Sequence, residues 1–286
     1  MTFKNSQELL ILCKDMPISE VMIRREIFIS NKTREQVFEA MRHAYKIMQA
    51  AIGSSLTDNL VSMGGLIGGE AKKIYNRRDN SVCGDIMSRA IAYAMGVLEV
   101  NTSMGLIVAA PTAGASGVIP GVFTALQQTK DLSEIEMTTA LFNAGAIGYL
   151  IMRNATVSGA EGGCQAEVGT ASAMAASAVV ELMGGSPEAC LCAASTAISN
   201  ILGMVCDPIG GLVEVPCQKR NAMGASNALI SAEIALANIT NHIPFDEIVD
   251  VMYKVGRSIP YELRETALGG LASAPSACNL CKSCSS

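Results

Sequence analysis

Long apolar segments that are repeatedly broken by Gly, Pro or Glu constrain the fold of this chain more than any other feature. Residues 104–126 contain two prolines and several glycines, and residues 171–206 are interrupted by Glu181, Glu188 and a Gly-Gly-Ser-Pro turn at 184–187. Neither segment offers the uninterrupted apolar run of roughly 20 residues that a membrane-spanning helix needs. Both are therefore predicted to form helices buried in a protein core.

The composition favours helices over sheets. Half of the 286 residues are hydrophobic, only 4% are aromatic, and Trp is absent, so small and flexible apolar residues provide the core. No stretch alternates between apolar and polar residues for long enough to form a sheet. The predicted fold is all-α, a compact bundle of apolar helices joined by Gly/Pro-rich loops. The helices are expected at 6–24 with a turn at Pro17, and at 34–52, 85–100, 133–153, 168–183, 187–203, 220–237 and 246–256. Thr33 precedes Gln36 by three positions, a capping-box arrangement that predicts the helix start at 34.

We expect one helical catalytic domain over residues 1–272 and a Cys-rich tail over residues 273–286. The net charge is −5 and no basic tract stands out, so nucleic acid is not an expected partner. The first apolar run is too short for a signal peptide and has acidic neighbours. Ten cysteines in such a chain indicate a reducing compartment, and we expect a cytoplasmic protein without a membrane partner.

Three cysteines lie in predicted loops beside or near Gly or Pro: Cys164, Cys206 and Cys217. The last two bracket a turn-rich dodecapeptide that could bring both thiolates to one centre, and the glycines let the backbone approach a bulky cluster. The spacing matches neither a ferredoxin nor a paired C-x₂-C zinc site, so a metal site and three unrelated thiols both stay open. Three thiolates on a cubane would leave one iron open for a substrate, as in a Lewis acid.

The other cysteines carry weaker signals. Free Cys is often buried, so core packing is expected for Cys13, Cys190 and Cys192, and Cys83 is expected to be structural. The tail contains Cys278, Cys281 and Cys284 in the pattern C-x₂-C-x₂-C. These thiols are either incidental to the terminus or include one that caps the open iron when substrate is absent.

Four motifs together resemble the α chain of bacterial iron–sulfur-dependent L-serine dehydratase. They are NTSMGLIVAAPTAGASGVIPG (101–121), GAEGGCQAEVG (159–169), CDPIGGLVEVPCQKRN (206–221) and ETALGGLA (265–272). They occur in the family's order, and the resemblance spans residues 55–278. The separations of 42 and 11 residues between the three loop cysteines are similar to the family's ligand spacing.

The resemblance implies a [4Fe-4S] cluster bound by Cys164, Cys206 and Cys217. It also implies a C-terminal cysteine on the fourth iron, displaced by serine; Cys278 lies nearest the expected distance after the GGLA segment. The implied reaction is elimination of water from L-serine without pyridoxal phosphate, giving pyruvate and ammonia, in amino-acid degradation and gluconeogenesis. Alternatives are an L-cysteine desulfidase-type lyase, a non-enzymatic iron–sulfur redox or sensor protein, and a zinc-stabilised scaffold.

The substrate carboxylate needs a cationic or N–H-rich cradle. Arg220, three residues after Cys217, is the best placed guanidinium for a bidentate contact, although an exposed arginine at a helix start would look the same. Lys72 is a weaker candidate, as is its neighbour Lys73. In the loop from Pro111 to Gly117, the Thr112 and Ser116 hydroxyls could cradle an anion, and tight helix packing is the alternative explanation.

A general base is missing from the shared motifs. His43 and His242 are the only histidines, and both lie in ordinary helical or surface contexts. The chain also lacks the N-terminal β portion with a Ser-Ser-His-Thr type motif that single-chain relatives carry. We therefore expect a separate β subunit, in a heterodimer or an α2β2 assembly, to supply the base, unless a lysine of this chain does.

Overall fold

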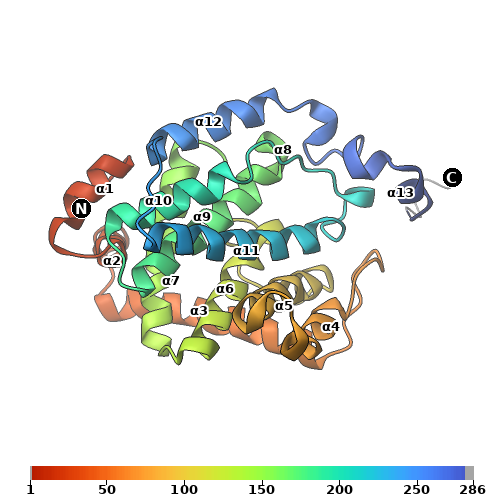
Figure 1. Ribbon diagram of the computed structural model, residues 1–286, viewed down its shortest axis with the longest axis horizontal. Coiled ribbons are helices and arrows are strands. Elements are labelled where there is room, and N and C mark those ends of the chain that lie inside the picture. The colour runs from red at the N-terminus through yellow and green to blue at the C-terminus, as the bar shows by residue number, and fades with distance from the viewer. Residues whose placement is uncertain (1, 281–286) are drawn as a thin grey trace.

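An almost wholly buried helix, α9 (Cys164–Leu182), runs through the middle of the computed structural model, which describes residues 2–280 (Figure 1). It packs against α7 (Glu134–Asn154), α10 (Pro187–Ser199) and α11 (Cys217–Leu236). Most side chains of α9 are Ala, Ser, Val or Gly. A helix that is apolar on every side must be surrounded by other elements, and α9 is.

A second group of helices packs beside this centre. It consists of α3 (Arg34–Thr57), α4 (Glu70–Asn76), α5 (Gly84–Thr102) and α6 (Val118–Lys130). Helices α5 and α6 approach so closely that a Cβ atom on Gly117 would lie 2.1 Å from the Ala94 carbonyl oxygen. The small residues of the sequence therefore set the distance between helices.

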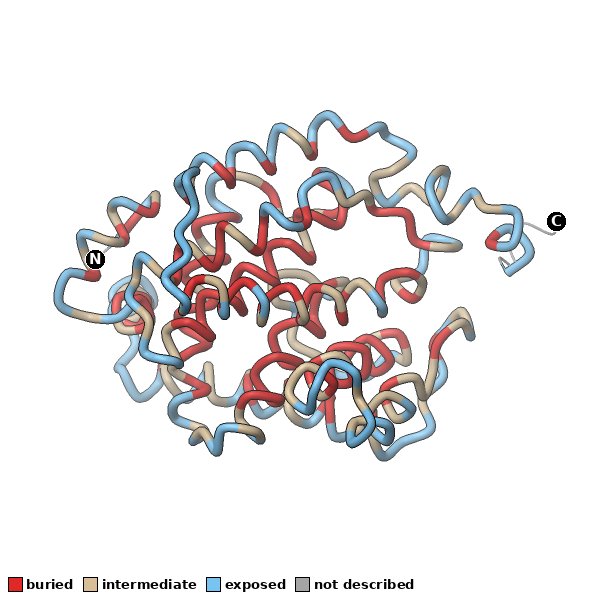
Figure 2. Tube along the Cα trace, viewed as in Figure 1, coloured by how far each residue is buried: buried red, intermediate tan, exposed pale blue. Residues whose placement is uncertain are grey.

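The remaining elements lie around these helices. They are α1 (Ser6–Leu12), α2 (Ile18–Ser30), α8 (Gly159–Gly162), α12 (Phe245–Ser258), α13 (Pro275–Leu280) and six short 3-10 helices: η1 (Cys13–Asp15), η2 (Arg78–Asn80), η3 (Ala113–Ala115), η4 (Ile209–Gly211), η5 (Tyr261–Leu263) and η6 (Gly270–Ser273). Figure 2 shows burial concentrated in the central helices, with alternating burial along α12. Helices α1 and α13 lie at opposite ends of the molecule (Figure 1).

The all-α prediction is confirmed. Within residues 2–280 the only β-type pairing is an isolated bridge between Cys206 and Arg264. The predicted capping box at Thr33 and Gln36 is present at the start of α3, which continues to Thr57. The segment predicted as one helix with a turn at Pro17 forms α1 and α2, and Pro17 caps the second. The division at residue 272 stays a prediction.

Two predicted helix starts are wrong, and the error concerns the site. Helix α9 begins at Cys164 rather than at 168, and α11 begins at Cys217 rather than at 220. Both cysteines therefore occupy the first position of a helix instead of a loop. Gly163, with φ of +75°, turns the chain into α9, and Pro216 directly precedes α11, where a missing N–H costs nothing.

One helix within the described part of the chain, α7, is long and apolar enough to cross a membrane. Of the window that meets this criterion, 67% is buried inside the protein, as in the core helix of a folded domain. Neither residues 104–126 nor residues 171–206 supply such a helix, in agreement with the sequence interpretation.

Candidate metal centre

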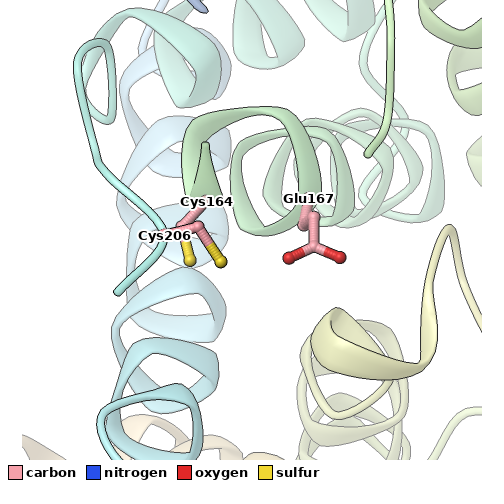
Figure 3. A group of neighbouring side chains, drawn as sticks. All are labelled: Cys164, Glu167 and Cys206. Carbon is pink, nitrogen blue, oxygen red and sulfur yellow. The ribbon is translucent and has the colours of Figure 1, made fainter. Parts of the chain in front are cut away.

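Two of the three predicted cysteine ligands meet at the N-terminal end of α9. The Cys164 and Cys206 sulfurs and a carboxylate oxygen of Glu167 all lie within 4.8 Å of one another. Figure 3 shows the two sulfurs side by side, with the Glu167 carboxylate beside them on the same helix as Cys164. Cys217 lies outside this tight group but is also buried, and the charge of Cys164 raises its pKa.

Cys206 is held by the segment that contains the ETALGGLA motif. Its backbone N–H donates to the Leu263 carbonyl at 2.8 Å, and its carbonyl accepts from the Glu265 N–H at 2.7 Å. The neighbouring Asp207 carboxylate accepts from the Leu271 N–H at 2.7 Å. Two motifs separated by about sixty residues therefore build one wall of the site.

The position of Cys217 is fixed by α11 and by the hydrogen bonds of two polar side chains near it. Asn221, one turn further along α11, donates to the carbonyls of Gly114 and Cys217 and accepts from the Gly117 N–H. Glu214, just before the helix, is buried and accepts three hydrogen bonds from residues 62–66. These contacts pack the 101–121 motif and the loop before α4 against the cysteine segment.

Arg220 points into the same centre. Its Nη1 lies 2.9 Å from the Val205 carbonyl oxygen, 2.7 Å from Asp207 Oδ1 and 3.5 Å from Cys164 Sγ. The side chain is only 16% exposed, so the alternative of an exposed arginine at a helix start is wrong. The guanidinium already binds protein groups, and its contact with a substrate carboxylate stays a prediction.

The surroundings shift the pKa values of the three thiols in different directions. A hydrogen bond with Cys206 and the nearby Arg220 charge lower the pKa of Cys164, against the effect of burial. The same hydrogen bond and burial raise the pKa of Cys206, and burial raises the pKa of Cys217 to about 12. A metal that binds here must displace protons from Cys206 and Cys217, and the lowered pKa of Cys164 makes its proton the easiest of the three to displace.

Glu167 is the acidic member of the group. Burial raises its pKa to about 7, and the charge of Glu265 adds to this effect. The Thr112 hydroxyl and the Gly159 N–H act in the opposite direction, although Thr112 Oγ1 makes no well-formed hydrogen bond. Thr112, predicted to touch substrate, therefore lies at the site beside Glu167.

The other predicted substrate residues make structural contacts. The Ser116 hydroxyl is buried and donates to the Ala113 carbonyl at 2.7 Å, which favours the packing explanation for that residue. Lys72 Nζ donates to the Thr57 and Asp58 carbonyls and so closes the C-terminal end of α3. The hydrogen bonds of Lys72 do not involve the three cysteines, and its role toward the substrate stays a prediction.

Cys278 is exposed on α13, which packs against η4 in the loop between Cys206 and Cys217. Helix α13 therefore lies against the loop that joins Cys206 and Cys217, and the role of Cys278 as a capping thiol stays a prediction. Cys281 and Cys284 lie outside the described residues. His43 on α3 and His242 before α12 are both exposed and lie outside the group of Cys164, Glu167 and Cys206.

The donor set fits an iron–sulfur cluster. Three buried cysteines lie at or near one centre, and soft thiolates favour iron–sulfur clusters or zinc over hard cations. Gly159 leaves room beside them, because a Cβ atom there would lie 3.2 Å from Cys206 Sγ. Arg220 offers a compensating positive charge.

Comparison with known proteins identifies the family of this chain. The family model described as "Serine dehydratase alpha chain" matches residues 13–272. The chain belongs to the serine dehydratase alpha chain family. The "Probable L-serine dehydratase, alpha chain" of Bacillus subtilis (strain 168) is 48% identical over 277 residues, covering 96% of this chain and 92% of that protein.

Two further relatives differ in how much of their own length this chain matches. The "L-serine dehydratase, alpha chain" of Peptoniphilus asaccharolyticus is 43% identical over 271 residues, or 93% of each chain. The "L-serine dehydratase 1" of Escherichia coli (strain K12) is 34% identical over 282 residues, covering 94% of this chain but 61% of that protein. The second relative thus extends well beyond the matched part.

Glu167, Asp207 and Glu214 lie within the sequence motifs, but the sequence interpretation assigns them no role. All three are carboxylates in Gly-rich or apolar segments of a chain with only 16% charged residues. A buried charge must be paired or hydrogen-bonded, so acidic residues in such segments are a signal for a site. Their partners come from distant segments, however, and no local pattern names them.

Proposed function

We propose that this chain is the α subunit of an L-serine dehydratase, a lyase that eliminates water from L-serine and gives pyruvate and ammonia. The observation that carries the proposal is the meeting of the Cys164 and Cys206 sulfurs beside Arg220, with a third buried cysteine, Cys217, close enough for the charge of Cys164 to act on it. The names of the α-chain relatives support serine as the substrate.

In this proposal Cys164, Cys206 and Cys217 hold a [4Fe-4S] cluster. When bound, the cluster supplies a Lewis acid with one open iron for the departing β-hydroxyl. Together with the hydrogen bond from Cys206, the Arg220 charge lowers the pKa of Cys164, and Arg220 pairs with the buried Asp207, so the ligand segment stays in place. The packed motifs around the cysteines exclude bulk water, which strengthens every charge interaction inside the site.

A separate β subunit completes the proposed enzyme and brings the general base, with L-serine bound between the two chains. Four large hydrophobic side chains are 69–77% exposed on two adjacent loops: Val61, Met63, Met104 and Leu106. The loops are joined by a hydrogen bond from the Met63 N–H to the Thr102 carbonyl. Large exposed apolar groups of this kind favour a protein partner.

The cluster is tested by anaerobic reconstitution followed by iron and sulfide analysis. We expect a brown wild-type protein and a large loss of iron in Cys217→Ser. The matched control is Cys83→Ser, because Cys83 is a free, exposed thiol. A colourless wild type with stoichiometric zinc, or full iron retention by Cys217→Ser, would refute the cluster.

The reaction is tested with the α chain alone and together with its β chain. We expect pyruvate and ammonia from L-serine only when both chains are present. Full activity of the α chain alone would refute the placement of the base on the β chain. Faster ammonia release from L-cysteine would favour a desulfidase, and a reversible cluster without turnover would favour a redox or sensor protein.

A further inference from the structure

Glu167 carries a carboxylate at the metal centre that the proposed function leaves without a role. It lies three residues after Cys164 on α9, and residues three apart share one face of a helix. The helix therefore presents the ligand sulfur and the carboxylate in the same direction, as Figure 3 shows. A carboxylate oxygen lies within 4.8 Å of the Cys164 and Cys206 sulfurs.

No cationic side chain within residues 2–280 forms an ion pair with Glu167. The guanidinium nearest the centre, on Arg220, forms its ion pair with Asp207. The groups that favour the ionised carboxylate, the Gly159 N–H and the Thr112 hydroxyl, are neutral. Burying a carboxylate without a compensating positive charge is costly, so a cation from outside the chain would stabilise it.

Two glycines keep the carboxylate accessible. A Cβ atom on Gly159 would lie 2.6 Å from Glu167 Oε2, and one on Gly114 would lie 3.4 Å from Oε1. These glycines come from two segments far apart in the sequence, one at the start of α8 and one in η3. A larger side chain at either position would press on the carboxylate.

We propose that Glu167 binds the α-ammonium of the amino-acid substrate and so selects amino acids over hydroxy acids. The inference rests on the proposed function, because it takes L-serine as the substrate. The ammonium and hydroxyl of L-serine are on adjacent carbons, so a hydroxyl at the metal centre places the ammonium within a few ångströms. The ligand thiolates and Glu167 together make this part of the site attract a cation such as the α-ammonium.

The test compares Glu167→Gln with wild-type holoenzyme, using L-serine and L-glycerate. L-glycerate keeps the carboxylate and the β-hydroxyl but carries a hydroxyl in place of the ammonium. The KM for L-serine and the inhibition constant of L-glycerate are measured anaerobically, and the visible and EPR spectra of the cluster report the binding of both ligands. We expect Glu167→Gln to weaken L-serine binding about 10- to 100-fold, the size of a lost charge-assisted hydrogen bond, and to change L-glycerate binding less than about threefold.

Iron and sulfide analysis of each variant separates this role from cluster binding. Glu262→Gln is the matched control, because Glu262 is exposed on η5 near the site and should leave both affinities unchanged. Equal weakening of both ligands, unchanged L-serine affinity, or loss of the cluster from Glu167→Gln would each overturn the inference. Failure of the proposed function is a separate result, since it would appear in the wild type as absence of cluster or of serine dehydration.

Discussion

Replacing Asn221 by Ala should destabilise the protein by about 2–4 kcal/mol. The side chain is fully buried and joins α11 to the loop at 112–117. Its loss leaves the buried Gly117 N–H without a partner, at about 1–3 kcal/mol, and the half-buried Gly114 carbonyl at about 1 kcal/mol. Loss of the third hydrogen bond, to the Cys217 carbonyl, adds little to the destabilisation, because this carbonyl lies within α11.

The assay is urea unfolding of the apoprotein, with thermal unfolding as a second measurement. For a chain of this size the loss corresponds to a fall in Tm of about 3–7 °C. Asn241→Ala is the control, because Asn241 is exposed and also bonds a carbonyl and a hydroxyl; we expect less than about 1 kcal/mol. A loss below about 1 kcal/mol for Asn221→Ala, at an unchanged m-value, would refute the reasoning.

Three further predictions test other parts of the fold. Gly270→Ala should loosen the segment over Asp207, because φ is +62° and the new Cβ would lie 2.3 Å from Asp207 Oδ2; limited proteolysis should cut there faster than in wild type. Arg220→Gln leaves a buried carboxylate unpaired and should cost about 3–5 kcal/mol and lower iron retention, measured by urea unfolding and iron analysis. Ser186→Ala removes the N-cap of α10 and should cost about 1 kcal/mol with no change in iron content; unchanged stability would contradict the cap.

The helical fold followed from local patterns that the structure preserves. Apolar periodicity placed the central helices, and the capping box at Thr33 placed the start of α3 within one residue. The helix starts at Cys164 and Cys217 were missed because polar and Gly-rich residues at a helix N-terminus resemble a loop. The apolar period begins only in the next turn of each helix.

The candidate site was only partly predictable. Cys164 and Cys206 are brought together as expected, and Arg220 lies beside them. Ser116 and Lys72 were chosen for their side-chain chemistry, but the structure uses both to satisfy backbone carbonyls. A hydroxyl or an ammonium serves a carbonyl as well as it serves a substrate, and sequence does not distinguish the two.

By itself the sequence determined the fold class, the cysteines and the family, because helix periodicity, residue chemistry and motif order are written along the chain. Only the tertiary structure decided which carboxylates accompany the thiols. Glu167 lies one helical turn from Cys164, yet its glycine neighbours come from two other segments. Whether a buried charge is paired depends on groups that are distant in sequence, and packing alone brings those groups to the centre where Cys164, Cys206 and Cys217 lie.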